Sequence, residues 1–203
     1  MPVDPTAPDG VYTLDLGLYR QTEQEAASLP LVVDGQPTEQ TSLRLGPIKV
    51  GGPPPDVISD NPTPQVRLNQ SLGDQITLLG YDLTDQDGRP ISTLSSPAST
   101  LDLTLYWQAD ASPTADYTTF LHLRDGSDQT VAQKDAPPAR GCYPTSLWDP
   151  GEIIIDEISL PLDNVPSGRY TPVVGLYNLA TGDRLLVPGH PNNEISLESI
   201  NLP

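Results

Sequence analysis

The sequence is poor in cysteine, in basic side chains and in long apolar runs, and each shortage excludes a class of protein. Its single cysteine, Cys142, excludes an intrachain disulfide and a zinc site built on cysteines. Ten Lys and Arg residues stand against 27 Asp and Glu residues, a formal net charge of −17, so the clustered cations that nucleic acids and anionic lipids require are missing. No run approaches the roughly 20 apolar residues of a membrane span, and Met1–Gly10 lacks the profile of a signal peptide. We therefore expect no nucleic-acid partner and no direct insertion into a membrane.

Sequence that favours helices is also scarce. The chain holds 24 Pro and 16 Gly, together 40 of 203 residues, and these residues interrupt helices and mark turns. Between them lie short segments in which apolar and polar residues alternate. In Thr100–Ala109, three leucines and Trp107 share one face, while Asp102, Thr104 and Tyr106 share the other. The pattern predicts an all-β protein, an antiparallel β-sandwich of the immunoglobulin-like or jelly-roll type.

The predicted sandwich occupies residues 66–203 as one complete domain with at least seven strands. Residues 51–65 precede it and are rich in Pro and Gly without apolar periodicity, which is typical of a semi-rigid linker. Alternation with polar neighbours places ten apolar residues in the core of the sandwich. They are Leu78, Leu101, Leu103, Leu105, Leu121, Leu123, Ile154, Val174, Leu176 and Ile200.

An internal repeat links the start of the chain to its end. Asp9–Tyr19 (DGVYTLDLGLY) matches Ser167–Tyr177 (SGRYTPVVGLY) with six identical residues at one offset, 168 − 10 = 158. Leu45–Val50 parallels Leu197–Leu202 at an offset of 152. We interpret residues 1–50 as the terminal strands of a preceding repeat unit. The alternative is a single domain whose two ends carry similar hairpins.

Such terminal strands need a sheet to complete, because an isolated strand pair is marginally stable and its free edges pair with other strands. Residues 9–50 are therefore predicted to dock against residues 66–203, against neighbouring repeat units, or against the same segment of another chain in a homodimer. Six apolar residues of this segment need burial: Leu14, Leu16, Leu18, Leu43, Leu45 and Ile48.

Several motifs between residues 67 and 203 resemble one family. They are Leu72-Gly-Asp74, Leu79-Gly-Tyr-Asp-Leu83, Leu103-Thr-Leu-Tyr-Trp107, Phe120-Leu-His-Leu123, Ala132-Gln-Lys-Asp-Ala-Pro-Pro138, Gly141-Cys-Tyr-Pro-Thr-Ser-Leu-Trp148, Pro150-Gly-Glu152 and Gly175-Leu-Tyr177. The chain resembles the C-terminal, extracytoplasmic β-sandwich of bacterial membrane glycosyltransferases of the protein-mannosyltransferase-like type. Catalysis in that family belongs to the membrane-embedded part. The resemblance therefore implies a non-catalytic accessory module, outside the membrane in the periplasm or at the cell surface, as part of a larger membrane protein.

The loop over residues 135–152 is the best candidate for a binding site, because binding groups often lie on loops of a rigid scaffold. An indole flanked by carboxylates and hydroxyls suits a sugar, whose C–H groups stack on the ring. The candidate residues are Asp135, Arg140, Tyr143, Thr145, Trp148 and Glu152. The alternative is structural, with Tyr143 and Trp148 capping the open end of the core.

Asp82, Asp85 and Asp87 precede Gly88 and suggest calcium, because closely spaced carboxylates suit a hard cation. Their spacing departs from the EF-hand pattern. Asp-Gly is also a common hairpin turn, so a plain turn is the stronger interpretation.

No motif indicates an enzyme. The sequence contains no G-x-S-x-G, H-E-x-x-H, G-x-G-x-x-G or P-loop pattern. Glu152 and Asp156 would lie roughly 13 Å apart along one strand, farther than the carboxylate pair of a glycosidase. His122 is interpreted as a partly buried core residue, and Cys142 has no assigned role.

Two functions remain open at this point. The first is an extracytoplasmic accessory module that binds a glycan beside a membrane glycosyltransferase. The second is a structural spacer or assembly module that pairs through strand edges and has no small ligand.

Overall fold

The computed structural model describes residues 4–22, 25–90 and 99–203. The chain forms two compact units, unit 1 up to Pro53 and unit 2 from Pro54 to Pro203. Within the described ranges, no helix is long and apolar enough to cross a membrane.

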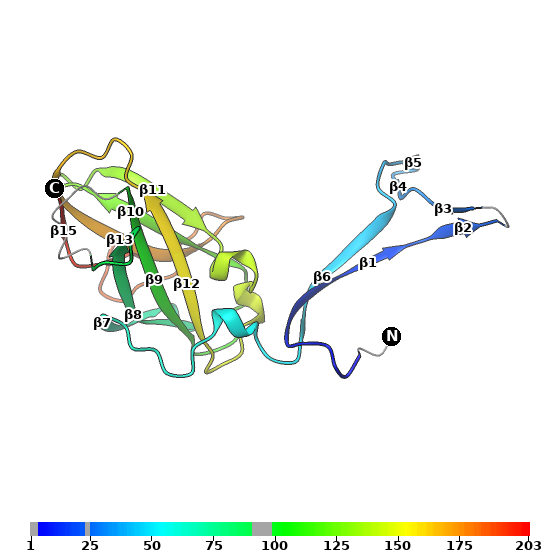
Figure 1. Cartoon of the computed structure of the whole chain (residues 1–203), viewed down its shortest axis with the longest axis horizontal. Coiled ribbons are helices and arrows are strands. Elements are labelled where there is room, and N and C mark those ends of the chain that lie inside the picture. The colour runs from blue at the N-terminus through cyan, green and yellow to red at the C-terminus, as the bar shows by residue number, and fades with distance from the viewer. Residues whose placement is uncertain (1–3, 23–24, 91–98) are drawn as a thin grey trace. The chain divides into compact units, whose positions relative to one another are not determined.

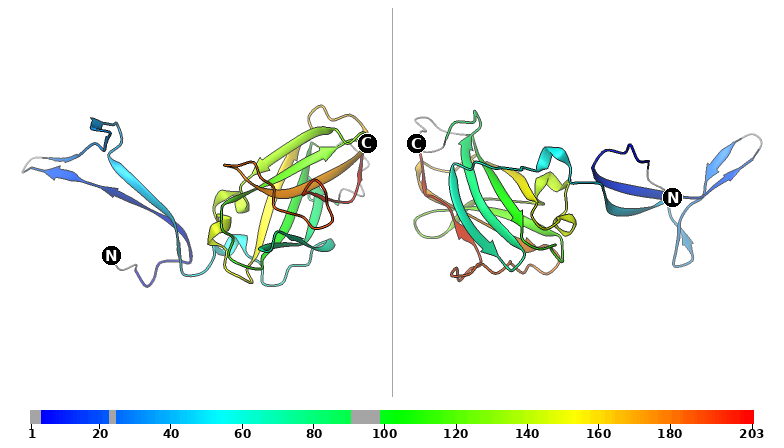
Figure 2. Two further views of the ribbon diagram at one scale, coloured as in Figure 1. Left: turned by 180° about the vertical axis from the view of Figure 1, so that it is seen from behind. Right: turned by 90° about the horizontal axis from the view of Figure 1, so that it is seen from below.

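Unit 2 consists of two antiparallel sheets (Figures 1 and 2). In the first sheet, β12 (Ile153–Pro161), β9 (Thr100–Ala109), β8 (Ile76–Asp85) and β7 (Val66–Leu72) lie in that order. In the second sheet, β11 (Thr130–Ala136), β10 (Tyr117–Arg124) and β13 (Gly168–Asn178) lie side by side, and β14 (Ile195–Ser196) and β15 (Ile200–Leu202) both pair with β13. The predicted all-β antiparallel sandwich is confirmed.

The core lies between the two sheets and is built by alternation. Along β9, every second residue is buried, from Leu101 to Ala109, and the residues between are half-buried. All ten residues predicted for the core are buried, with exposed fractions of at most 4%. The period of two therefore identified the inward face correctly, because a residue and its second neighbour point to the same side of a strand.

The predicted linker is wrong over most of its length. Residues 54–65 belong to unit 2. Pro55–Val57 forms a short 3-10 helix, Val57 is 1% exposed, and the Ser59 N–H donates to the Ile153 carbonyl over 2.9 Å. Val57, the bond to β12, the Gln65 N–H bond to Asp82 and the ion pair of Asp56 with Arg140 join this proline-rich segment to the sandwich.

Unit 1 is a two-stranded ribbon with two small hairpins. The strands β1 (Gly10–Gly17) and β6 (Ser42–Val50) pair antiparallel. The hairpins contain β2 (Tyr19–Gln21) with β3 (Ala26–Ser28), and β4 (Val32–Val33) with β5 (Gln36–Pro37). Among the residues of unit 1 that the structure describes, no second layer covers this ribbon.

Candidate functional site

The loop after β11 forms a cap whose aromatic residues point inward. Two short 3-10 turns shape it, Ala139–Gly141 and Thr145–Leu147. Trp148 is fully buried, and its Nε1–H donates to the Tyr143 carbonyl over 3.1 Å. Tyr143 is also fully buried, and its hydroxyl donates to the Leu147 carbonyl over 2.9 Å and contacts the Glu152 carboxylate.

Thr145 joins the same cap to the second sheet. Its hydroxyl donates to the Ala115 carbonyl over 2.7 Å and accepts the Tyr117 N–H over 2.8 Å. A buried indole offers no face to a sugar ring, so the prediction that Trp148 is a surface platform is wrong. The contacts of Tyr143, Thr145 and Trp148 fit the structural alternative, a cap on the core.

The other residues predicted for this site have separate partners. Asp135 lies on β11 and accepts a hydrogen bond from the Tyr177 hydroxyl over 3.1 Å. Arg140 forms ion pairs with Asp56 at 3.3 Å and with Glu157 at 3.7 Å. Glu152 accepts the Asp149 N–H over 2.9 Å. These contacts do not bring the six predicted residues together around one ligand.

The three aspartates considered for calcium are divided between two environments. Asp85 is 1% exposed and accepts N–H groups of Asp87 and Arg89, each over 2.9 Å. Asp82 lies on the opposite face of β8 and accepts the Tyr106 hydroxyl over 2.7 Å. In the described part of the chain, no group of three His, Cys, Asp or Glu residues is placed to hold a metal ion. Asp85 and Asp87 shape a turn that Arg89 completes, which fits the interpretation of this segment as a plain turn, and Asp82 takes no part in it.

Asp156 lies in the core rather than in a cleft. Its carboxylate accepts the Trp107 Nε1–H over 3.1 Å, the Thr119 hydroxyl over 2.7 Å and the Ala139 N–H over 3.1 Å. Burial raises the pKa of this carboxyl to about 6, although the three hydrogen bonds act in the opposite direction. The residue connects β9, β10 and the cap, which is a structural role.

His122 lies on the outward face of β10 against Phe120, with ring centroids 5.0 Å apart. Its side chain is 15% exposed, and burial lowers the pKa of the imidazole. Nearby, the Glu194 carboxylate lies between Arg124 at 2.7 Å and Arg184 at 2.8 Å. The charges of this cluster are paired with one another, which fits a structural ion-pair network.

The outward face of the first sheet carries a continuous band of polar side chains. Strand register aligns them in rows across β8, β9 and β12. The first row holds Thr84, Asp102 and Ser159. The second row holds Asp82, Thr104 and Glu157. In the third row Tyr106 lies beside Ile155. A hollow of about 300 Å³ opens over this band, lined by Thr84, Asp102, Leu103, Thr104, Glu157, Ile158 and Ser159.

Hydrogen bonds hold two carboxylates of the band, Asp82 and Asp102, in place. The Ser159 hydroxyl donates to Asp102, and Asp82 accepts both the Tyr106 hydroxyl and, over 2.6 Å, the Gln65 N–H. Burial, together with the bond to Asp82, raises the pKa of Tyr106 to about 12, so its hydroxyl stays a donor. The band therefore presents oriented carboxylates and hydroxyls beside one aromatic ring.

The sequence contained the signal for this band. The polar side of Thr100–Ala109 holds Asp102, Thr104 and Tyr106, which alternation alone marks as an outward face. What the sequence could not show is that β8 and β12 place hydroxyls and carboxylates in the same rows.

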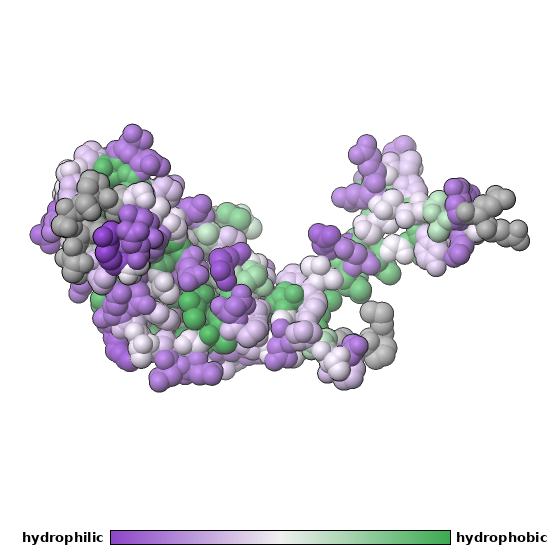
Figure 3. Space-filling model, viewed as in Figure 1, coloured by the Kyte–Doolittle hydropathy of each residue, from purple (hydrophilic) through white to green (hydrophobic). Residues whose placement is uncertain are grey.

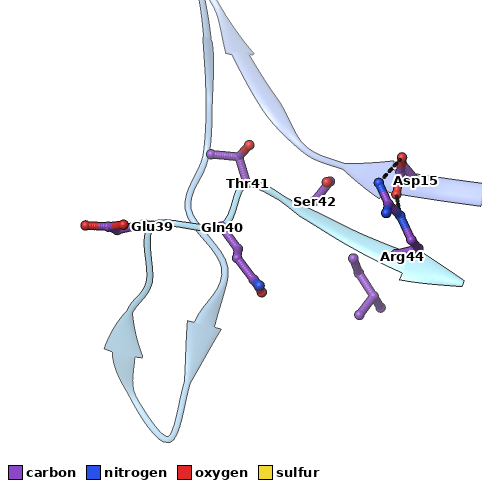
Figure 4. A pocket seen from close by; sticks show the side chains of 7 residues that line it. Asp15, Glu39, Gln40, Thr41, Ser42 and Arg44 are labelled. Carbon is purple, nitrogen blue, oxygen red and sulfur yellow. Dashed lines mark hydrogen bonds and ion pairs between the residues drawn. The ribbon is translucent and has the colours of Figure 1, made fainter. Parts of the chain in front are cut away.

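Another hollow, of about 450 Å³, lies in unit 1 along β6 (Figure 4). Figure 4 shows the Arg44 guanidinium turned onto the Asp15 carboxylate, an ion pair of 2.9 Å. Both side chains are largely exposed, 72% and 48%, and such surface pairs contribute little stability. The hollow has one short ion pair and no buried polar group, so the sheet face of unit 2 is the better candidate site.

Fold and site together define a β-sandwich with an open, polar sheet face. No family model and no curated protein matches the chain. Among solved structures, the C-terminal domain of Wzt is similar at 12% sequence identity and a TM-score of 0.47, over 69% of this chain and 80% of that one.

Proposed function

We propose that this chain is a non-catalytic accessory module that binds a glycan on the outward face of the sheet β12-β9-β8-β7. The observation that carries the proposal is the band of carboxylates and hydroxyls over the hollow that Asp102, Thr104, Glu157 and Ser159 line, with Asp102 held by the Ser159 hydroxyl. Sugars present many hydroxyl donors, and carboxylate acceptors form charge-assisted hydrogen bonds with them. A neighbouring tyrosine ring supplies an apolar contact.

The charge of the band indicates the class of sugar. Asp82, Asp102 and Glu157 contribute three carboxylates to adjacent rows. Two basic side chains lie near them: Arg140 is divided between Glu157 and Asp56, and Arg67 lies opposite Gly80 in the row of Tyr106. An anionic polysaccharide would be repelled by this surface. We therefore expect neutral or amino sugars as ligands, bound as a chain across the open sheet rather than in a closed pocket.

The setting of this module is part of the proposal. The motif Pro-Pro-x-x-Gly-x-Tyr-Pro-Thr-Ser-x-Trp-x-Pro-Gly-Glu over residues 137–152 supports an extracytoplasmic place beside a membrane glycosyltransferase. Most of this motif builds the cap, with Tyr143, Thr145 and Trp148 buried. Its residues therefore maintain the fold, and the ligand contacts would come from the sheet face.

Calorimetric titration with neutral, amino and anionic oligosaccharides tests the site. We expect a neutral or amino sugar to bind the wild-type chain, and Asp102→Asn or Glu157→Gln to weaken binding about tenfold or more, since each removes one charged acceptor. Asp74→Asn, in the exposed turn between β7 and β8, removes the same charge elsewhere and should leave the affinity unchanged. Equal affinities for all four proteins, or no binding by any sugar of the panel, would refute the site.

The alternative function, an assembly module without a small ligand, has one specific observation in its favour. Among the described residues of unit 1, eleven large apolar side chains are at least 39% exposed, including Leu16, Leu18 and Leu43. A ribbon of this kind is an interaction surface whether or not unit 2 binds a glycan.

A further inference from the structure

The ribbon of unit 1 has one apolar and one polar face. Three facing pairs on the apolar side, Tyr12 with Ile48, Leu14 with Leu45 and Leu16 with Leu43, are between 39% and 56% exposed. The other side carries the ion pair of Asp15 with Arg44. Figure 3 shows apolar residues at the surface along this unit. A strand pair with such a face is stable only when a second layer covers it.

The structure of this ribbon repeats that of β13 with β14 and β15. Gly10 pairs with Val50 and Tyr12 with Ile48, as Gly168 pairs with Leu202 and Tyr170 with Ile200. Farther along, Asp15 pairs with Arg44 and Leu16 with Leu43, as Val173 pairs with Ser196 and Val174 with Ile195. Every one of these pairs follows the same two offsets, 158 for the first strand and 152 for the second.

A side-chain hydrogen bond repeats as well. The Tyr12 hydroxyl donates to the Pro8 carbonyl over 2.7 Å, and the Tyr170 hydroxyl donates to the Pro166 carbonyl over 2.8 Å. The two segments are therefore the same structural piece, with the same register and the same corner.

The two copies differ in burial. In unit 2, Tyr170, Val174, Leu176 and Ile200 are at most 6% exposed, while their equivalents Tyr12, Leu16, Leu18 and Ile48 are 39%, 56%, 74% and 42% exposed. The second copy is covered because β13 pairs along one edge with β10, where Leu121 faces Val174, and because its inner side contributes to the core of the sandwich. Within the described residues, β1 pairs with β6 alone.

We propose that the apolar face of unit 1 completes a second β-sandwich domain, one of the unit 2 type that lacks its own last strands. In this second domain, a strand equivalent to β10 has a free edge, and β1 pairs with that edge. An apolar sheet face of the same domain covers Tyr12, Leu16, Leu18 and Ile48. This interface would repeat the one that β13 and β15 already make inside unit 2.

A second copy of this chain does not fit the same role. In unit 2 the place beside β10 is already filled by β13.

A fusion protein tests the proposal. Because Pro8 and Pro166 are equivalent, residues 54–165 are joined directly to Pro8 at the head of residues 8–203. We expect a monomer in which hydrogen exchange at the amides of 10–17 and 42–50 is slowed by roughly a hundredfold or more relative to the unfused chain. Leu16→Asp with Leu18→Asp in the same fusion should abolish that protection, since both side chains would have to enter a core.

A tandem of two complete copies of residues 54–203 is the folding control, because its first copy closes with its own strands. If both copies of the tandem are protected and residues 10–17 of the fusion are not, the proposal is wrong. It is equally wrong if the unfused full chain is a dimer by light scattering with residues 10–17 protected, because a second copy then covers the face.

Discussion

Replacing Asp156 with alanine is expected to lower the free energy of unfolding of the chain by about 3–5 kcal/mol. The carboxylate accepts hydrogen bonds from Trp107, Thr119 and Ala139, and each buried donor left without an acceptor costs about 1–3 kcal/mol. Urea unfolding monitored by tryptophan fluorescence measures the change. Asp74→Ala in the exposed β7–β8 turn is the matched control and should stay within about 0.5 kcal/mol of wild type. An equally small change for Asp156→Ala would show that the three donors find other partners.

The same carboxyl makes stability depend on pH in a defined direction. Burial raises its pKa from the ordinary 3.8 to about 6, so between these values the folded chain holds a proton that the unfolded chain has released. The stabilisation is complete below pH 4 and is lost as the pH rises through 6. Relative to Asp156→Asn, which cannot titrate, the wild-type chain should gain about 1.4 kcal/mol between pH 7 and pH 5. A difference that is constant over this range would contradict the raised pKa.

Replacing Trp148 with alanine is expected to cost about 3–5 kcal/mol of stability, because the fully buried indole leaves a cavity in the cap. Trp148→Phe keeps most of the apolar volume and loses the bond from Nε1 to the Tyr143 carbonyl, so its cost should be about 1–2 kcal/mol. Both variants are measured by urea unfolding, and sugar binding is measured under conditions in which they are folded. If Trp148→Ala is stable and no longer binds the sugar, the binding site lies in the loop over residues 135–152 and not on the sheet face.

Features that follow from strand alternation could be predicted from the sequence. Alternation along Thr100–Ala109 identified both the core leucines and the polar face, because strand geometry assigns sides by parity. The same alternation places Asp156 on the inward side of its strand, with Ile154 and Ile158. It does not reveal that Trp107 and Thr119 donate the hydrogen bonds that offset the cost of burying this carboxylate.

The two wrong predictions, an exposed Trp148 and an extended linker, have a common cause. Trp148 and Val57 lie in segments without periodicity, where composition alone favoured an exposed platform and an extended spacer. Their burial depends on packing against distant strands, which no local pattern records. The polar rows of the first sheet are a similar case, since they exist only after β8, β9 and β12 pair in register.

The repeated register has a consequence for the folding reaction. Two segments of one chain, 10–18 and 168–176, share one register, and the second lies on the edge of β10. We therefore expect the first to compete for that edge while the chain folds. The chain between β10 and residues 10–18 is roughly twice as long as the chain between β10 and residues 168–176. The larger loop-closure entropy disfavours pairing of residues 10–18 with β10 by only about 0.6 kcal/mol. Chain length therefore discriminates weakly, and the correct pairing must be selected by side-chain fit around Phe120 and Leu121. With β13 on that edge, the apolar side chains of the ribbon, Leu16 and Leu18 among them, remain exposed and available to a domain with a free edge of the same kind.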